Sequence, residues 1–126
     1  MFFQRAQSPH PSRLGGIQIF SDSEGRFLLF PVIRSRSGSS HILAAVEPLS
    51  PPLTAPELGT ALLALWDRWE GTPCWEELPP ELTEVPFWKG TARSYRAFFR
   101  AHRLIVAAFG HPNPGDISLA YWPRHL

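Results

Sequence analysis

The sequence predicts a single α+β domain, in which a mainly antiparallel sheet of about five strands packs with two main helices. Two segments carry apolar residues at helical spacing. The 126 residues are 44% hydrophobic, which suits one domain with one core. Short apolar runs bounded by turn residues are typical of strands, and they occur at Gly16–Phe20, Arg26–Ile33, His41–Glu47, Leu104–Phe109 and Ile117–Trp122.

The first three strands are separated by short polar segments, which favours an antiparallel meander. Ser21–Gly25 has the composition of a turn, and Gly25 can take a positive φ. Arg34–Ser40 (RSRSGSS) is a polar loop. Pro31 lies inside the second strand and cannot donate a backbone hydrogen bond, so it indicates an edge or an irregularity there.

The first helix is predicted to begin after Thr54. Thr54 is a good N-cap, Pro56 lies in the first turn and Glu57 follows three residues after the cap, which together form a capping box. Gly71 and Pro73 end the helix, which runs to about Trp69. Its expected core face consists of Leu58, Ala61, Leu62, Leu65 and Trp69.

The second helix is expected over 91–103, with Thr91 as its N-cap. It leads directly into the apolar strand Leu104–Phe109, which is expected to be buried on both faces and to pair with Ile117–Trp122 as a hairpin. One expected helix face carries Ala92, Tyr95, Phe98, Phe99 and His102. The adjacent arc, with Lys89 just before it, forms a basic face of Lys89, Arg93, Arg96, Arg100 and Arg103.

Charge is distributed unevenly along the chain, although the formal net charge is only +1. From Asp67 to Glu84 there are six acidic residues and one basic residue. From Lys89 to Arg103 there are five basic residues and no acidic one. Two neighbouring segments of opposite sign suggest two distinct surfaces. Between the helices, Glu70–Trp88 is expected to be irregular, with one short helical turn.

We expect residues 1–13 to be loosely ordered and the domain to span 14–126. No stretch reaches the roughly 18 apolar residues of a membrane span, and the N-terminus lacks the apolar core of a secretory signal. The single Cys74 excludes an internal disulfide and suits a reducing compartment. The expected location is the cytoplasm, with no membrane partner.

The residues offer little support for catalysis, and we expect a protein that is not an enzyme and needs no cofactor. The histidines and the one cysteine lack metal-ligand spacing, so no metal site is predicted. His102 could act as a general base, but a packed or capping histidine near a helix end is the stronger interpretation. Cys74 could be a nucleophile, yet its acidic neighbours would raise the pKa of its thiol.

Three segments then suggest a family. Gly25–Pro31 (GRFLLFP), Leu58–Leu62 (LGTAL) and Ser94–Phe98 (SYRAF), the last followed by a short apolar strand, extend over about two thirds of the chain. Together they resemble the immunity proteins of bacterial contact-dependent growth inhibition systems. The resemblance implies a cytoplasmic protein that binds the C-terminal domain of a cognate toxin, often a nuclease, and blocks its active site or substrate surface. It implies no catalytic residue and does not place the interface.

We expect the acidic segment to bind the toxin, because tryptophan is common at binding hot spots and carboxylates suit a basic nuclease groove. The expected toxin-binding residues are Asp67, Glu70, Trp75, Glu76, Glu77, Glu81 and Glu84. In another interpretation, Trp75 and Trp88 only cover the core. The alternative function is a small nucleic-acid-binding protein that uses the arginine-rich helix, although the nearby acidic segment would repel phosphate. An enzyme acting through His102 is a third possibility.

Overall fold

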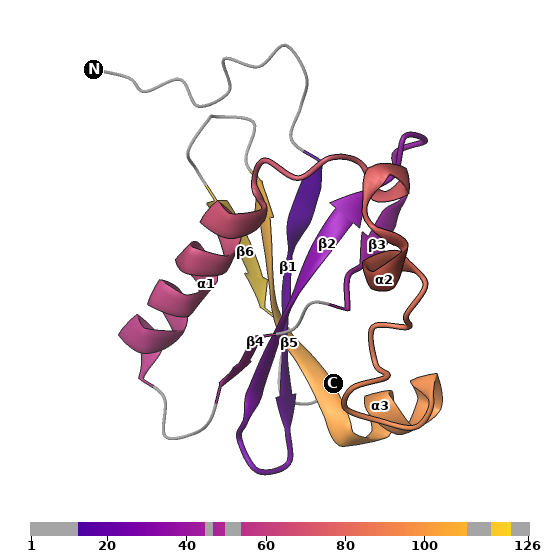
Figure 1. Ribbon diagram of the computed structural model, residues 1–126. Helices are drawn as coiled ribbons and strands as arrows, with labels where there is room; N and C mark the ends of the chain where they lie inside the picture. The colour runs from indigo at the N-terminus through magenta and orange to yellow at the C-terminus, as the bar shows by residue number, and fades with distance from the viewer. Residues whose placement is uncertain (1–12, 45–46, 50–53, 111–116, 122–126) are drawn as a thin grey trace, which may run out of the picture.

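The computed structural model describes residues 13–44, 47–49, 54–110 and 117–121 and has the expected α+β fold (Figure 1). The elements in chain order are β1 (Leu14–Asp22), β2 (Phe27–Arg34), β3 (Ser40–Ile42), β4 (Glu47–Leu49), α1 (Ala55–Trp69), the 3₁₀ turn η2 (Trp75–Glu77), α2 (Pro80–Thr83), α3 (Tyr95–Ala101), β5 (His102–Gly110) and β6 (Ile117–Tyr121). All strand pairs are antiparallel, and the sheet order is β3-β2-β1-β5-β6, with β4 also paired to β2.

The predicted meander is confirmed, because β1, β2 and β3 are neighbours in the sheet. The turn between β1 and β2 is held by Asp22, whose carboxylate accepts hydrogen bonds from the backbone N–H groups of Glu24 and Arg26 and from the Arg26 guanidinium. Gly25 has φ +79°, as the turn requires. The hairpin of β5 and β6 is also confirmed, with Ala107 opposite Ala120.

The third predicted strand, His41–Glu47, is instead divided into β3 and β4, which both pair with β2. The division lies opposite Pro31. Its carbonyl accepts a hydrogen bond from Leu43 N–H at 2.8 Å, so its nitrogen faces the same neighbour but has no proton to donate. The ladder therefore lacks one hydrogen bond at Leu43, where the pairing with β3 ends before β4 pairs with β2 again, and the irregularity expected at Pro31 is found. Residues 45–46 lie outside the described residues.

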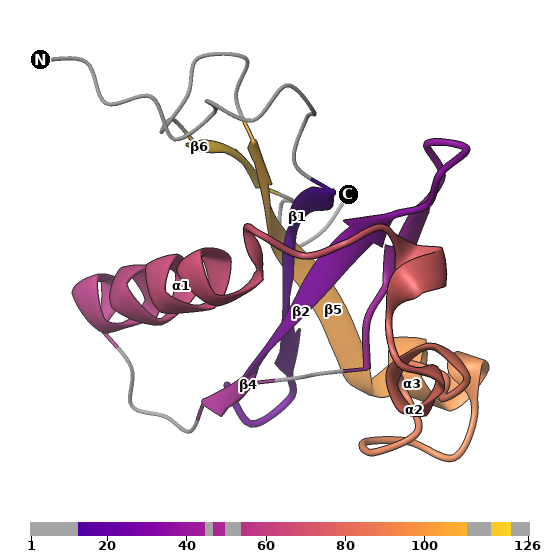
Figure 2. The same ribbon diagram turned by 45° about the horizontal axis from the view of Figure 1, so that its top comes forward.

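The sheet is covered on both faces. Successive side chains of a strand point in opposite directions, so β2 contributes apolar residues to each face. Leu29 and Ile33 of β2 point toward α1, whereas Leu28 and Phe30 point toward α3. Figure 2 shows the central strands between α1 on one side and α2 and α3 on the other. One core cluster forms on each face.

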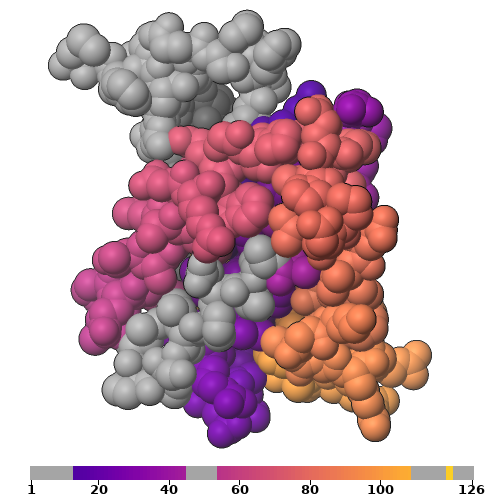
Figure 3. Space-filling model, viewed as in Figure 1, coloured from indigo at the N-terminus to yellow at the C-terminus, as the bar shows by residue number. Residues whose placement is uncertain are grey.

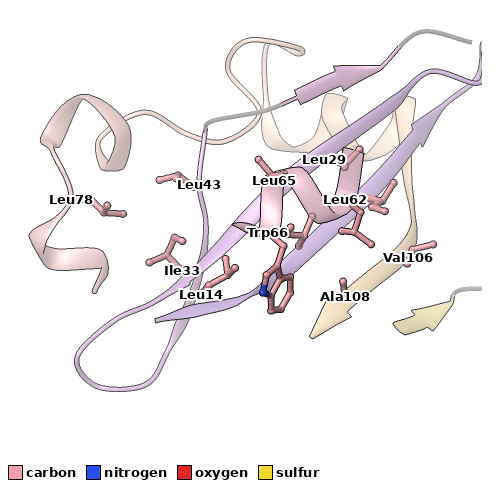
Figure 4. Close-up of a cluster of buried hydrophobic side chains, with 12 residues drawn as sticks. Leu14, Leu29, Ile33, Leu43, Leu62, Leu65, Trp66, Leu78, Val106 and Ala108 are labelled. Carbon is pink, nitrogen blue, oxygen red and sulfur yellow. The ribbon is translucent and has the colours of Figure 1, made fainter. Parts of the chain in front are cut away.

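The first, called the α1 cluster, consists of Leu14, Ile17, Ile19, Leu29, Ile33, Leu43, Leu62, Leu65, Trp66, Leu78, Val106 and Ala108 (Figure 4). The second, called the phenylalanine cluster, consists of Phe20, Leu28, Phe30 and Phe98. In the second, the Phe98 ring meets those of Phe20 and Phe30 edge to face, with centroid distances of 5.2 Å and 5.9 Å. Edge-to-face ring contacts stabilise the folded state beyond what the burial of apolar area contributes.

The start and length of the first helix are as predicted. The Thr54 hydroxyl accepts a hydrogen bond from Glu57 N–H, and the Glu57 carboxylate accepts one from Thr54 N–H. The core face differs by one residue, because Trp66 is buried and Trp69 only half-buried. Trp66 lies four residues after Leu62 and so shares its side of the helix. Figure 4 shows Trp66 beside the α1 cluster residues of the sheet.

The second main helix is shorter than predicted. Its N-cap is Ser94, whose hydroxyl accepts a hydrogen bond from Ala97 N–H at 3.0 Å. Thr91 instead lies in the preceding turn, where its backbone N–H and its hydroxyl both donate to the carbonyl of Trp88, and no helix begins there. α3 ends at Ala101, and His102 already has the extended backbone of β5. The direct passage from helix to strand is confirmed, and Val106–Ala108 are buried as expected.

Of the N-terminal segment 1–13 that was predicted to be loosely ordered, only Arg13 belongs to the described residues. Residues 1–12 and 122–126 lie outside them. Arg13 is an exception to the expected loose segment. Its carbonyl accepts a hydrogen bond from Arg34 N–H, and its guanidinium donates to the carbonyl of Ser35. Among the described residues, none of the helices is both long enough and apolar enough to cross a membrane.

Two adjacent leucines of α1 test this packing. Leu62 is 8% exposed in the α1 cluster, whereas Leu63 is 53% exposed. Leu62→Ala should lower the free energy of unfolding by about 2–5 kcal/mol, because it removes buried apolar atoms and leaves a cavity. Leu63→Ala is the matched control and should change it by less than about 0.5 kcal/mol. Urea denaturation measures both, and equal effects would show that the helix face is wrongly assigned.

Candidate functional site

The acidic residues predicted to bind a toxin lie on three successive elements. Asp67 is near the end of α1 and Glu70 follows it, Glu76 and Glu77 belong to η2, and Glu81 is in α2 with Glu84 just after. Figure 3 shows that α1, η2 and α2 follow one another across one side of the molecule. The structure therefore spreads these carboxylates along a path instead of gathering them in one loop.

Two of the carboxylates hold η2 against the turn between β2 and β3. Glu76 Oε1 accepts a hydrogen bond from the backbone N–H of Arg36 at 3.0 Å, which lowers the pKa of the Glu76 carboxyl. Glu77 Oε2 lies 3.8 Å from the Arg36 guanidinium. Glu76 and Glu77 are thus engaged within the protein, which the sequence did not reveal because Arg36 lies some 40 residues away.

Cys74 lies beside this contact and is buried. Its thiol donates a hydrogen bond to Glu77 Oε2 at 3.0 Å. This bond to an anion raises the pKa of the Cys74 thiol, as expected from the sequence, and burial raises it further. A thiol in this state is a poor nucleophile at neutral pH.

Trp75 both packs within the protein and lines an open groove. Its ring stacks on His41 of β3, with centroids 4.7 Å apart and 20° between the planes. The side chain is half-buried and packs against the α1 cluster. The interpretation that Trp75 covers the core is therefore correct in part, but the same residue also lines an open groove.

This groove, called the β3 groove, has a volume of about 470 Å³ and runs beside the edge strand β3. It is open to solvent and is framed by β3, Trp75, the segment after α2, and α3. The lining residues are Ser40, His41, Ile42, Trp75, Thr83, Glu84, Val85, Pro86, Phe87, Tyr95 and Phe99. Of the predicted toxin-binding residues, the β3 groove brings together Trp75 and Glu84 only.

Two aromatic side chains of α3 form one wall of the β3 groove. Tyr95 is 60% exposed and Phe99 41% exposed, and their rings lie 4.8 Å apart. Both rings also meet Phe87 at 6.2 Å. The predicted aromatic helix face is therefore mixed, since Phe98 is fully buried while these two rings are exposed. Their spacing of four residues marks them as neighbours on a helix, but not which side of it is covered.

The basic face predicted for one helix is divided among three kinds of structure. Only Arg96 and Arg100 lie on α3, because Lys89 and Arg93 precede the helix and Arg103 is already in β5. All five side chains are exposed. Turns and the helix-to-strand transition separate these residues, so they do not form the continuous helical stripe that their spacing suggested.

His102 follows the last residue of α3 and contacts Phe98 of that helix. Its Nδ1–H donates a hydrogen bond to the carbonyl of Phe98 at 3.0 Å, and its ring stacks on the Phe98 ring at 4.3 Å. These contacts match the interpretation of a packed, capping histidine. Within the described ranges there is no group of three or more His, Cys, Asp or Glu side chains that could hold a metal ion.

Comparison with known proteins gave no match to a family model, a curated protein or a solved structure.

The contact between Glu76 and Arg36 predicts a pH-dependent stability difference. Because folding lowers the pKa of Glu76 from 4.5, its ionised form stabilises the folded state at higher pH. This contribution is lost as the pH falls through the folded pKa. Wild type should be more stable than Glu76→Gln at neutral pH, and the difference should vanish in acid. Denaturant titrations across this range measure it, with Glu81→Gln as the control. A constant difference would contradict the assignment.

Proposed function

We propose that this protein is a non-catalytic binding module that recognises another protein through the surface around the β3 groove. The single observation that carries the proposal is an open groove beside a sheet edge, with the exposed rings of Tyr95 and Phe99 and the carboxylate-bearing Glu84 in its lining. Aromatic residues are enriched at binding hot spots because they bury a large area with few rotatable bonds. The groove is framed by packed elements, so little order has to be gained on binding.

The proposed partner is the toxin domain of a contact-dependent growth inhibition system, which this chain would neutralise as its immunity protein. The resemblance of the three quoted segments to such immunity proteins supports this partner. The charge distribution is compatible with it, because a nuclease groove is basic and carboxylates can occupy it in place of phosphate.

The carboxylates differ in their availability for such a partner. Glu76 and Glu77 already contact Arg36, so a partner would compete with that contact. The exposed carboxylates of Glu81 and Glu84 have no hydrogen bond or ion pair within the described residues. Glu81 and Glu84 are therefore the better candidates for long-range attraction of a basic domain, and they are the better residues to change.

Nucleic-acid binding is the second candidate, and one arrangement favours it. Arg96 and Arg100 flank the exposed rings of Tyr95 and Phe99 on α3, and bases can stack on such rings while cations meet phosphates. Only two of the five basic residues belong to this helix, and the described residues that line the β3 groove include a carboxylate but no Lys or Arg. The protein-binding proposal therefore has the stronger support.

Co-production in cells tests the proposed function. Cells that make the toxin domain encoded beside this chain's gene should survive only when they also make this protein, and the two purified proteins should form a stable complex. Survival without the protein, or purification of this chain with nucleic acid and no protein partner, would contradict the proposal.

A pair of variants with matched charge change tests the contribution of the carboxylates. Glu81→Gln combined with Glu84→Gln should slow association with the toxin domain severalfold at low salt, because long-range attraction is lost. The difference should shrink as salt is added. Thr60→Lys with Ala64→Lys gives the same change in net charge on an exposed side of α1, and should slow association less.

Stopped-flow or surface-plasmon kinetics across a salt series measure these rates. If the glutamate pair binds like wild type while Arg96→Gln with Arg100→Gln abolishes binding, the partner lies on the basic side of α3 instead.

A further inference from the structure

We propose that the β3 groove binds an extended segment of the partner protein that presents an arginine or lysine side chain between the aromatic walls. The inference rests on the proposed function, since it takes the partner to be a protein, and it adds the chemistry of the recognised segment. It depends on three properties of the groove, which concern its backbone, its rings and its charge.

The backbone of β3 offers unpaired hydrogen-bonding groups along the groove. Leu43 N–H bonds to β2, and Ser39 carbonyl accepts from Ser35 N–H, so residues 39, 41 and 43 face inward in the alternation of an antiparallel pair. Ser40 and Ile42 therefore direct their N–H and C=O groups away from β2, and these have no partner within the described residues. An extended segment can pair with such an edge.

The rings of the β3 groove suit a cation. Tyr95 and Phe99 expose ring surface, and Trp75, whose ring stacks on His41, is also part of the lining. The face of an aromatic ring attracts a guanidinium or ammonium group, most strongly for tryptophan and tyrosine. The aliphatic stem of an arginine or lysine would cover apolar surface at the same time.

The charge of the β3 groove favours a basic partner segment over an apolar or an acidic one. Glu84 lines the β3 groove, and its carboxylate has no partner within the described residues. A purely apolar segment would remove this carboxylate from water without pairing it, which is costly, and an acidic segment would be repelled. Arg96 and Arg100 follow Tyr95 and Phe99 on α3 by one residue, about 100° further around the helix, and they are not part of the lining. A cationic side chain is thus the one that the groove complements.

A short synthetic peptide provides the test. The probe is a capped five-residue peptide in which threonine alternates with arginine, and the control peptide has citrulline in place of arginine, which keeps the shape and removes the charge. In NMR titrations of the whole protein, the arginine peptide should shift the amide signals of Ser40 and Ile42 and the indole signal of Trp75. It should bind about fivefold tighter than the citrulline peptide, or more, as expected of a cation near rings and a carboxylate.

Variants of the groove give the second measurement. Glu84→Gln and Tyr95→Ser should each weaken binding of the arginine peptide severalfold, and both side chains are exposed enough for the fold to survive, which thermal melts verify. Arg96→Gln is the control on the same helix and should not weaken it. Equal affinity for the two peptides, no binding at millimolar concentration, or self-association through the groove would each overturn the inference.

The outcome can be separated from that of the proposed function. If the toxin domain binds wild type and the Glu84→Gln and Tyr95→Ser variants equally well, the protein is a toxin-binding module and the groove is not its recognition site. If no toxin domain binds at all while the arginine peptide occupies the groove, the proposed partner is wrong and the chemistry of the groove remains.

Discussion

The arrangement of this molecule depends on the pairing of β1 with β2 on one side and β5 on the other. A strand that is paired at both edges and apolar on both faces needs cover above and below. α1 supplies it on one face and α3 on the other. The chain from Glu70 to Ser94 must therefore pass from one face to the other, and its contacts with Arg36 and His41 show that it does so beside β3.

The β3 groove is a consequence of that passage. The connecting segment lies close to β3 without forming backbone hydrogen bonds to it within the described residues, and the space between them is framed by α3. Recognition would then be placed where two core clusters meet, on elements that packing holds in position. Preorganised surfaces of this kind lose little conformational entropy when a partner binds.

The local parts of the fold were predictable because short-range chemistry determines them. Thr54 and Glu57 cap α1 through atoms three residues apart, and Gly25 takes the positive φ of its turn. The start of α3 was not predictable in the same way, since Thr91 and Ser94 are both good caps. In the folded protein Phe98 packs in the phenylalanine cluster, the Ser94 hydroxyl accepts from Ala97 N–H, and Thr91 lies in the turn that precedes the helix.

The candidate site was the least predictable part, because it is assembled from distant segments. Trp75 and Glu84 were selected because they lie in an acidic segment that contains tryptophan. The other parts of the groove come from β3 and α3, which are separate segments of the chain. No local pattern states that Arg36 would contact Glu76 and Glu77. The charge pattern alone could therefore indicate an acidic segment, but it could not separate carboxylates with an internal contact from those that remain available.

Pro31 has a consequence for the solubility of this protein. By dividing the neighbouring strand, it leaves β3 only three residues long. Long, flat sheet edges can pair with the edges of other molecules without limit and lead to aggregation, and natural proteins avoid them with short edge strands and proline. A three-residue edge can hold one short peptide but cannot template an extended sheet, so a single missing N–H can favour selective recognition over open-ended self-association.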